Sequence, residues 1–302
     1  MLDVRRLSLL SDLDRLGTIA AVATARAYTP SAVSQQLAAL EREAGAVLLE
    51  RSGRRVTFTA AGRVLVRQTA AVLAALEEAE SELAATRSGT AGEIRIGAFP
   101  TAMRTVLPPA LVTLGRDHPA LELSVSELDP AAVPPALRDR RLDVGLLHDY
   151  DVAPAVTGPA LESVALLDET VHLAVPPHAA FGSLADTRDA PWILGSPGTL
   201  CHEVALRVCQ GAGFEPRARH HIDDFDAVLA LVAAGQGVAL IPQLALPSKP
   251  PVRLIPAPTR RRTRIGYRRG AAAHPAVRAV VAALQTSAQQ LMGRGLRGRS
   301  ER

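Results

Sequence analysis

The sequence of 302 residues predicts an α+β protein of several domains: a small helical domain, a long linker helix and a larger α/β domain of two lobes. Three observations predict this order. Two short helical segments with a tight connection stand near the N-terminus, a stretch free of helix breakers follows, and strand-like segments then alternate with helical ones. We place the three parts at residues 1–59, 60–88 and 92–302.

Two helices joined by a tight connection are predicted near the N-terminus. Thr18 is a suitable N-cap for a helix over residues 19–26, and Thr29 is one for a second helix that begins at Pro30. The second helix has an inward stripe made of Val33, Leu37, Leu40 and Ala44. Its outward face carries short polar side chains, as required of a helix that enters the major groove of DNA. An ordinary helical hairpin with a solvated face is the alternative.

A short basic hairpin is predicted directly after these helices. The segment LLERSGRRVTFT has the pattern of a strand, a turn and a second short strand. Its arginines would neutralise phosphates while the preceding helix contacts base edges, unless the turn is merely solvated. The combination predicts a winged helix-turn-helix domain that binds double-stranded DNA. Its predicted contact residues are Thr29, Pro30, Ser31, Ser34, Gln35, Arg51, Arg54 and Arg55.

One long helix is predicted from residue 60 to about residue 87, because this stretch contains no proline and its apolar positions recur at intervals of four and three. These seam positions are Leu65, Thr69, Val72, Leu76, Ala79 and Leu83. The seam favours packing against the same helix of a second copy, in a homodimer or homotetramer. Packing of the helix on its own domain is the alternative.

Strand-like segments alternate with helical ones from residue 93 onward, in the βαβ order that favours a mostly parallel sheet. The order repeats, so we expect lobe I at about 92–161 and 269–302, and lobe II at about 162–268. In such sheets, ligands bind beyond the carboxyl ends of strands, where helix N-termini offer free N–H groups to anions. Two turns of this kind are predicted at residues 99–102 and 196–199.

The segments VSQQLAALEREAG and LLERSGRRVTFTAAG resemble the LysR-type transcriptional regulators, and the resemblance extends over nearly the whole chain. It implies a DNA-binding regulator that dimerises through the linker helix and has a periplasmic-binding-protein-like effector domain. It matches the outward residues of the second helix and the basic hairpin to the family's DNA contacts. The family often has Gln at the position of Pro30 and Arg at the position of Gln35, so the base preference of its known members does not transfer.

The resemblance also implies a small-molecule effector between the two lobes. Matching positions and the two predicted turns give the expected effector site: Pro100, Thr101, Asp129, Gly198, Thr199, Leu200 and Phe225. We expect a carboxylate-bearing effector, because both turns offer hydroxyl and N–H groups. Asp129 disfavours an anion unless it orients a hydroxyl or an amine. Ordinary helix caps are the alternative reading of both turns.

Charge and hydropathy fit this assignment. Within residues 1–67 ten arginines (5, 6, 15, 26, 42, 51, 54, 55, 63 and 67) face six acids (3, 12, 14, 41, 43 and 50), as affinity for nucleic acid requires. The runs RRRTR at 260–264 and GRGLRGRSER at the end are interpreted as solvated segments. No apolar run is long enough to span a bilayer and the N-terminus has no secretory pattern, so a cytoplasmic protein is expected.

The two cysteines, Cys201 and Cys209, do not form a disulfide framework. Their segment is similar to the peroxide-sensing branch of the family, although their spacing is one residue shorter. On one helix they would lie about 12 Å apart along the axis, whereas a disulfide needs Cα atoms within about 7 Å. Buried structural thiols are therefore favoured over a redox switch.

Enzymatic function is not expected, because no nucleophile elbow, P-loop or dinucleotide fingerprint is present and the eight histidines are scattered. We accordingly predict no catalytic residue, no metal and no cofactor. Two rival functions remain at this point: a solute-binding-type protein with a helical scaffold that does not bind DNA, and an α/β enzyme with an appended dimerisation module.

Overall fold

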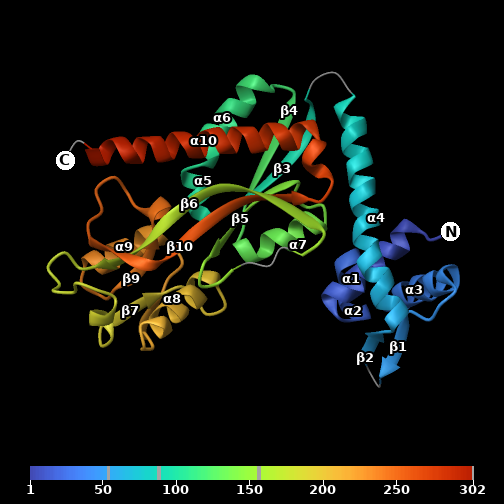
Figure 1. The fold of residues 1–302 in the computed structure, drawn as a ribbon, viewed down its shortest axis with the longest axis horizontal. Helices are drawn as coiled ribbons and strands as arrows, with labels where there is room; N and C mark the ends of the chain where they lie inside the picture. Colours follow the sequence, from blue (N-terminus) through green and yellow to red (C-terminus); the bar gives the residue numbers. More distant parts are fainter. Residues whose placement is uncertain (53–54, 87–89, 155–157, 301–302) are drawn as a thin grey trace. The chain divides into compact units, whose positions relative to one another are not determined.

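The computed structural model describes residues 1–52, 55–86, 90–154 and 158–300. The chain forms two compact units. The first comprises Met1–Leu83 with Arg269–Ala271, and the second comprises Ala84–Arg268 and Ala272–Arg302. Figure 1 labels the helices and strands of both units.

The first unit is helical with one small sheet. Its elements are α1 (Val4–Leu16), α2 (Ile19–Arg26), α3 (Pro30–Ala44), β1 (Leu49–Ser52), β2 (Arg55–Phe58) and α4 (Ala60–Ala85), and β1 pairs antiparallel with β2. The side chains of Asp3, Thr18 and Thr29 each accept a hydrogen bond from a backbone N–H in the first turn of α1, α2 and α3. Leucine and valine side chains from all three helices form the buried core of this unit.

The second unit is an α/β assembly. Its larger elements are β3 (Gly92–Ala98), α5 (Pro100–Arg104), α6 (Leu107–Asp117), β4 (Leu121–Glu127), α7 (Val133–Arg138), β5 (Val144–Tyr150), β6 (Leu161–Val175), β7 (Pro191–Leu194), α8 (Leu200–Gly211), β8 (Arg217–His221), α9 (Phe225–Ala233), β9 (Ala239–Pro242), β10 (Arg253–Arg268) and α10 (Pro275–Ser300). Four short 3-10 turns accompany them: η1 (Pro130–Ala132), η2 (Ala185–Thr187), η3 (Gln243–Ala245) and η4 (Ala271–Ala273).

Two long strands run through the main sheet. The six strands have the order β4-β3-β5-β10-β6-β9, and β7 and β8 form a separate parallel pair. β3 is parallel to β4 and β5, but β10 is antiparallel to both β5 and β6, and β6 is antiparallel to β9. The parallel pairing expected from the βαβ order is confirmed for β3, β4 and β5, whereas the pairs formed by β10 and β6 are antiparallel. Apolar periodicity identifies a strand but does not give its direction.

Two predicted elements divide or merge in the structure. The helical stretch after β3 is broken into α5 and α6, because Thr105 leaves the helical region (φ −121°, ψ −68°) and prolines open α6. Conversely, residues 253–268 form the single long strand β10. Its pairing with β6 shifts register between Pro256 and Arg260, so the strand bends without ending.

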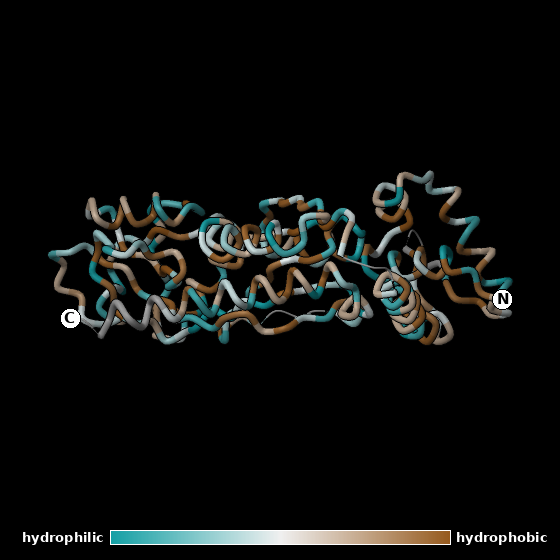
Figure 2. The backbone as a smooth tube through the Cα atoms, turned by 90° about the horizontal axis from the view of Figure 1, so that it is seen from above, coloured by the Kyte–Doolittle hydropathy of each residue, from teal (hydrophilic) through white to brown (hydrophobic). Residues whose placement is uncertain are grey.

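Helices cover the main sheet on different sides (Figure 1). α10 runs along the sheet, where it packs on α6 and β6, and α7 packs on β5 and β10. We call β3, β4, β5 and α5 to α7 the first lobe, and β7 to β9, α8 and α9 the second lobe; β6 and β10 belong to both. Figure 2 shows hydrophobic and hydrophilic residues mixed along the helices. No helix of the described residues is long and apolar enough to cross a membrane.

Candidate nucleic-acid interface and effector site

The outward face of α3 carries the predicted DNA-contact residues. Pro30, Ser31 and Gln35 are exposed, and Ser34 is half-buried. The Thr29 hydroxyl caps the helix by accepting from the Ala32 N–H at 3.1 Å, and it also lies 3.0 Å from the Ser31 hydroxyl. The Ser34 hydroxyl donates to the Pro30 carbonyl at 2.9 Å, which leaves it only acceptor capacity toward a partner.

The position of α3 is fixed by ion pairs and by a carboxylate that holds the following loop. Glu41 accepts from the N–H groups of Leu48 and Leu49 at 2.8 and 3.1 Å, which sets the path from α3 into β1. Arg6 of α1 pairs with Glu43 and donates to the Gln36 amide oxygen at 2.9 Å. These contacts hold α3 rigidly while its opposite face stays open.

A second ionic group joins α1 to α2. The Asp12 carboxylate is only 8% exposed and lies 2.6 Å from Arg26 Nε and 3.1 Å from Arg15 Nη2. Two guanidinium groups compensate the buried charge, as a buried carboxylate requires. These ion pairs thus fix α1 and α2 relative to each other.

The basic hairpin is only partly within the described residues. The backbone places Arg51 opposite Val56 and Arg55 opposite Ser52 in the β1–β2 pair, next to the connecting turn. Arg54 lies outside the described residues. The pairing forms the hairpin that the sequence predicts for a wing.

The seam of α4 leaves large apolar side chains in solvent. Val72, Leu76 and Leu83 are 40%, 41% and 66% exposed, whereas Thr69 is buried and its hydroxyl donates to the Leu65 carbonyl at 2.8 Å. In the single chain each of these side chains keeps at least 40% of its surface exposed. They form a surface that suits another apolar surface.

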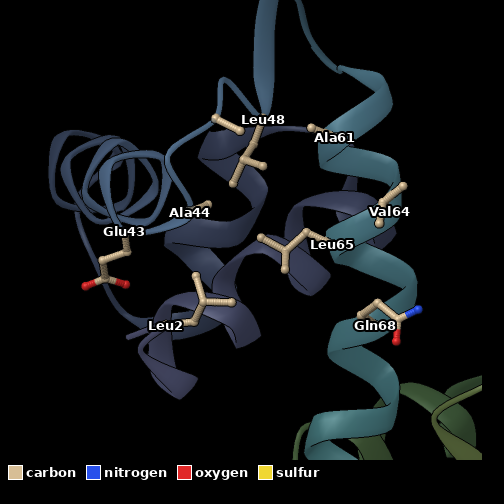
Figure 3. A pocket seen from close by; sticks show the side chains of 9 residues that line it. Leu2, Glu43, Ala44, Leu48, Ala61, Val64, Leu65 and Gln68 are labelled. Atoms are coloured by element: carbon tan, nitrogen blue, oxygen red, sulfur yellow. The ribbon is translucent and has the colours of Figure 1, made fainter.

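An open apolar groove of about 430 Å³ adjoins the start of this seam. Figure 3 shows Leu48 and Leu65 directed toward it from the connection between α3 and β1 and from α4. Val64 borders the groove and is 48% exposed. Leu65 belongs to both surfaces, so the groove continues the seam.

The first effector turn is closed in the structure. Pro100 is exposed, but Thr101 is only 3% exposed, and its hydroxyl accepts from Arg261 Nη2 at 3.2 Å. Asp129, predicted in the same site, follows β4 and accepts from the Ala131 N–H at 2.8 Å. The Leu128 N–H donates to the Ala98 carbonyl at the end of β3, so Asp129 lies beside the turn of Thr101.

The second effector turn holds a carboxylate of the protein itself. Asp223 accepts from the Ser196 N–H at 2.8 Å and from the Ser196 hydroxyl at 2.6 Å. Gly198 has φ of +90°, a conformation that favours glycine, and Thr199 caps α8 by accepting from the His202 N–H at 3.3 Å. The anion-binding capacity expected of this turn is therefore in use.

Leu200 and Phe225 are separated in the second lobe. Leu200 packs against an apolar cluster that contains Tyr150 and Val171. Phe225, at the start of α9, lines a small cavity of about 30 Å³ together with Cys201 and Asp223. The other lining residues are Ile193, Leu194, Gly195, Ala205, Ile222, Val228, Ala239 and Leu240.

A buried ion pair was missed by the sequence analysis. Arg261 of β10 and Glu169 of β6 are 1% and 2% exposed, and their Nε and Oε1 atoms lie 2.8 Å apart. The Arg261 guanidinium also lies 5.2 Å from the centre of the Phe99 ring. Burial lowers the pKa of Arg261, but the charge of Glu169 raises it above its usual value, so the group stays charged. The interpretation of the run RRRTR as uniformly solvated was wrong for Arg261 and Thr263, which face inward because side chains alternate along a strand.

The Arg261–Glu169 pair lies on a path between the lobes. Arg261 reaches Thr101 in the first lobe, while the second carboxylate oxygen of Glu169 accepts from the Leu244 N–H in η3. A further ion pair joins Arg104 of α5 to Asp226 of α9, with Asp224 at 3.6 Å. A change in the angle between lobes must disturb these contacts.

His148 of β5 is buried without a hydrogen-bond partner on either ring nitrogen. Its ring meets Phe99 edge-on at 4.6 Å and Tyr150 at 5.6 Å. It stands opposite Thr263 of β10, whose hydroxyl is also buried without a partner. Burial and, secondarily, the charge of Arg261 hold the pKa of His148 well below 6.5, so the ring is neutral. One nitrogen is then an acceptor and the other a donor.

Both cysteines are free and lie on α8. Cys209 is fully buried, and burial raises its pKa to about 12. Cys201 is half-buried with its sulfur 4.0 Å from the Tyr150 hydroxyl. Burial raises its pKa, Arg261 lowers it, and the charges of Asp129 and Asp223 raise it further. Neither thiol is activated, and over the described residues no group of three or more His, Cys, Asp or Glu side chains is placed to hold a metal ion.

Comparison with known proteins covers both units. Residues 4–63 match the model of the family described as bacterial regulatory helix-turn-helix protein, lysR family, and residues 87–289 match that of the LysR substrate binding domain. The probable hydrogen peroxide-inducible genes activator of Mycobacterium avium is 33% identical over 231 residues, which are 74% of this chain and 73% of that protein. The transcriptional dual regulator GltC of Bacillus subtilis is 28% identical over 220 residues, 70% of this chain and 71% of that protein.

Two solved structures share the arrangement of elements over nearly the whole chain. CbnR, a LysR family transcriptional regulator solved as the full-length protein complexed with its target DNA, is 25% identical with a TM-score of 0.52, over 95% of this chain and 100% of that one. A C206 mutant of OxyR from Corynebacterium glutamicum is 24% identical with a TM-score of 0.57, over 96% of this chain and 92% of that one, which bears on the fold alone.

Proposed function

Because the chain belongs to the LysR family of bacterial transcriptional regulators, we propose that it recognises an operator through the outward face of α3 and responds to an effector held between its two α/β lobes. A sequence-specific DNA-binding regulator with an effector-binding domain is the function of this family. The observation that carries the proposal is the exposed polar face of a capped, ion-paired α3. The DNA-binding family match at residues 4–63 favours this function over a solute-binding protein.

We assign base reading to α3 and phosphate contact to the hairpin. Gln35 and Ser31 lie one turn apart on the exposed face, and an exposed glutamine amide suits an adenine edge. Thr29 and Pro30 bring the helix N-terminus, which attracts phosphate, to the same side. Arg51, Arg54 and Arg55 are proposed to neutralise phosphates without reading sequence.

We propose that two copies associate through the seam of α4. Val72, Leu76 and Leu83 are exposed in one chain, and the groove beside Leu65 extends the same apolar surface. Burying this surface between copies removes it from water and presents two α3 helices to two half-sites. The oligomer is thus a homodimer, or a homotetramer built from it.

We propose that the effector site of the second unit lies between the two turns, of which the first contacts the buried ion pair. Thr101, Asp129, Gly198 and Thr199 would contact the ligand from the lobes, with Pro100, Leu200 and Phe225 around them, and a carboxylate would meet the hydroxyl groups. The support is the path of contacts from Thr101 through Arg261 and Glu169 to η3. A ligand that changes this path would bias the angle between lobes.

We propose the domain boundaries 1–59, 60–88 and 92–302, and a cytoplasmic protein without enzymatic activity. The support is the regulatory character of the relatives.

The test is binding of the purified protein to its own upstream intergenic DNA and to a scrambled duplex at two salt concentrations, with particle mass measured in parallel. We expect selective binding by a dimer or tetramer, with an affinity that falls as salt rises. Equal affinity for both duplexes, or binding by monomers alone, would refute the proposal.

A further inference from the structure

The charged groups around the proposed effector site are mostly acidic. Five carboxylates line or adjoin it, from Asp129, Glu169, Asp223, Asp224 and Asp226. The arginines among these contacts are Arg104 and Arg261. These charged groups determine what charge a ligand of this site must carry, an inference that rests on the proposed function.

Both arginines already form ion pairs with carboxylates of the protein. Arg261 is paired with Glu169, and Arg104 is paired with Asp226 and Asp224. By contrast, within the described part of the chain neither Asp129 nor Asp223 forms an ion pair with an arginine or lysine. The hydrogen bonds that they accept come from uncharged donors, the Ala131 N–H and the two groups of Ser196. A purely anionic ligand would thus meet two uncompensated negative charges.

The two carboxylates belong to opposite lobes. Asp223 lines the small cavity with Cys201, and Asp129 lies beside the Thr101 turn at the end of β3. The Tyr150 hydroxyl links the same thiol to the strand that carries His148. The electrostatic effect of both aspartates on the thiol agrees with this placement.

The buried side chain of His148 is an independent observation that points to a ligand. Its side chain is more than nine-tenths buried and shares a face of β5 with Tyr150, which points toward Cys201. Both ring nitrogens lack a hydrogen-bond partner, and an unmatched buried polar group is costly. A neutral imidazole can accept a hydrogen bond from an N–H donor of a ligand.

We propose that the effector carries a protonated amine, which Asp129 and Asp223 receive from the two lobes with His148 as a buried acceptor. Together with a carboxylate, which would have to replace Arg261 at the Thr101 hydroxyl, this makes the effector a zwitterion of the amino-acid class. The cavity beside Phe225 holds about 30 Å³, so it accepts only a short apolar side chain. Amine binding joins the lobes because each aspartate belongs to a different one.

The experiment measures binding of each proteinogenic amino acid to the full-length protein. Each amino acid that binds is then compared with the carboxylic acid that has the same side chain but lacks the amine. Trp192 is the only tryptophan and directly precedes three residues of the cavity lining, so its fluorescence reports binding in the second lobe. We expect at least one small apolar amino acid to bind, and its deamino counterpart to bind at least about tenfold more weakly, since hydrogen bonds to charged groups are involved. Binding by no amino acid, or equal binding by the deamino acid, would overturn the proposal.

Asp129→Asn is the informative variant, because asparagine preserves the cap on η1 while removing the charge. We expect it to weaken amino-acid binding about tenfold or more, whereas the matched control Asp186→Asn, which alters a carboxylate bonded to Gly182 and Ser183, should have no effect. Unchanged affinity in Asp129→Asn would also overturn the proposal.

DNA binding measured on the same samples separates the two proposals. Selective operator binding by a protein that ignores amino acids refutes the amine site and leaves the regulator assignment intact. Amino-acid binding by a protein without operator selectivity refutes the regulator assignment and leaves the amine site intact.

Discussion

Arg261 of β10 stands directly opposite Glu169 of β6, and the two side chains form an ion pair that is almost completely buried. The pair joins the two long strands that belong to both lobes, next to the register shift between Pro256 and Arg260. The charged pair therefore holds together the part of the fold that a change of lobe angle must deform.

Removing one partner of this pair should destabilise the second unit strongly. Glu169→Gln leaves the guanidinium of Arg261 buried without a counter-charge, and such losses cost about 3–5 kcal/mol. Urea unfolding of the purified protein measures this free energy. The exposed pair of Arg260 and Asp168 is the matched control, and Asp168→Asn should cost under about 1 kcal/mol. Similar losses in both variants would contradict the assigned role of the buried pair.

The buried neutral His148 predicts acid sensitivity. Its folded-state pKa is lowered by burial and then by Arg261, so below the ordinary value of 6.5 the unfolded chain binds a proton that the folded chain does not. Stability should be full above pH 6.5 and fall by up to about 1.4 kcal/mol per pH unit as pH decreases toward the folded-state value. Urea unfolding at pH 7.5, 6.5 and 5.5 measures the slope. His148→Leu should flatten it; an unchanged slope would assign the effect to other groups.

Gln35→Ala should reduce discrimination between the operator and a scrambled duplex by about 1–3 kcal/mol, because the amide is proposed to contact a base edge. Fluorescence anisotropy with both duplexes measures the difference. Gln210→Ala, an exposed helical glutamine on α8, controls for the loss of a polar side chain. An equal loss of affinity for both duplexes would indicate that Gln35 contacts phosphates and not base edges.

Arg54→Ala should weaken all duplexes alike and flatten the dependence of affinity on salt by about one unit of log–log slope. The same titrations, repeated at several salt concentrations, give this slope. A loss confined to the operator would mean that the hairpin reads bases.

Leu76→Glu should convert the oligomer to smaller particles without unfolding the chain, because this side chain is already 41% exposed in the single chain. Burial of a carboxylate at a packed seam carries a large desolvation cost. Mass photometry against concentration measures the assembly, and circular dichroism checks the fold. Ala71→Glu, on an exposed part of α4 away from the seam, is the control. Intact oligomers in Leu76→Glu would place the interface elsewhere.

Neither cysteine should react rapidly in the native protein. With a pKa of about 12, only about one Cys209 thiol in 10⁵ is a thiolate at pH 7. The two residues also lie on one helix, so a bond between them requires α8 to unwind. Mass spectrometry after peroxide treatment should show no disulfide between Cys201 and Cys209 while the helix is intact. Cys201→Ser serves as the control, and rapid disulfide formation would establish a redox response.

The helices with clear caps were predictable from local signals. α2 and α3 begin where Thr18 and Thr29 were expected to cap them, because a cap depends on a few neighbouring residues. Thr199 caps α8, which was the alternative reading of its turn. The break between α5 and α6 was not foreseen, although Pro108 and Pro109 are a visible signal for it. Strand direction in the main sheet depends on long-range pairing, which local periodicity does not encode.

The effector site was less predictable than the DNA-binding helices. Thr101 was expected as an open ligand contact, but it is closed by Arg261, which lies 160 residues further along the chain. Because side chains alternate along a strand, the sequence could predict that every second residue of RRRTR lies on the same face. It did not show that this face is buried, because burial depends on residues distant in sequence that pack over the sheet, such as Phe99 against Arg261.

The exposed seam of α4 makes the amount of protein in the cell a regulatory input. If operator binding requires two chains, then below the association midpoint its occupancy rises with the square of the chain concentration. Doubling the expression level would quadruple occupancy in that range, before any effector acts. A regulator that controls its own synthesis would then respond steeply to small changes in its gene dosage.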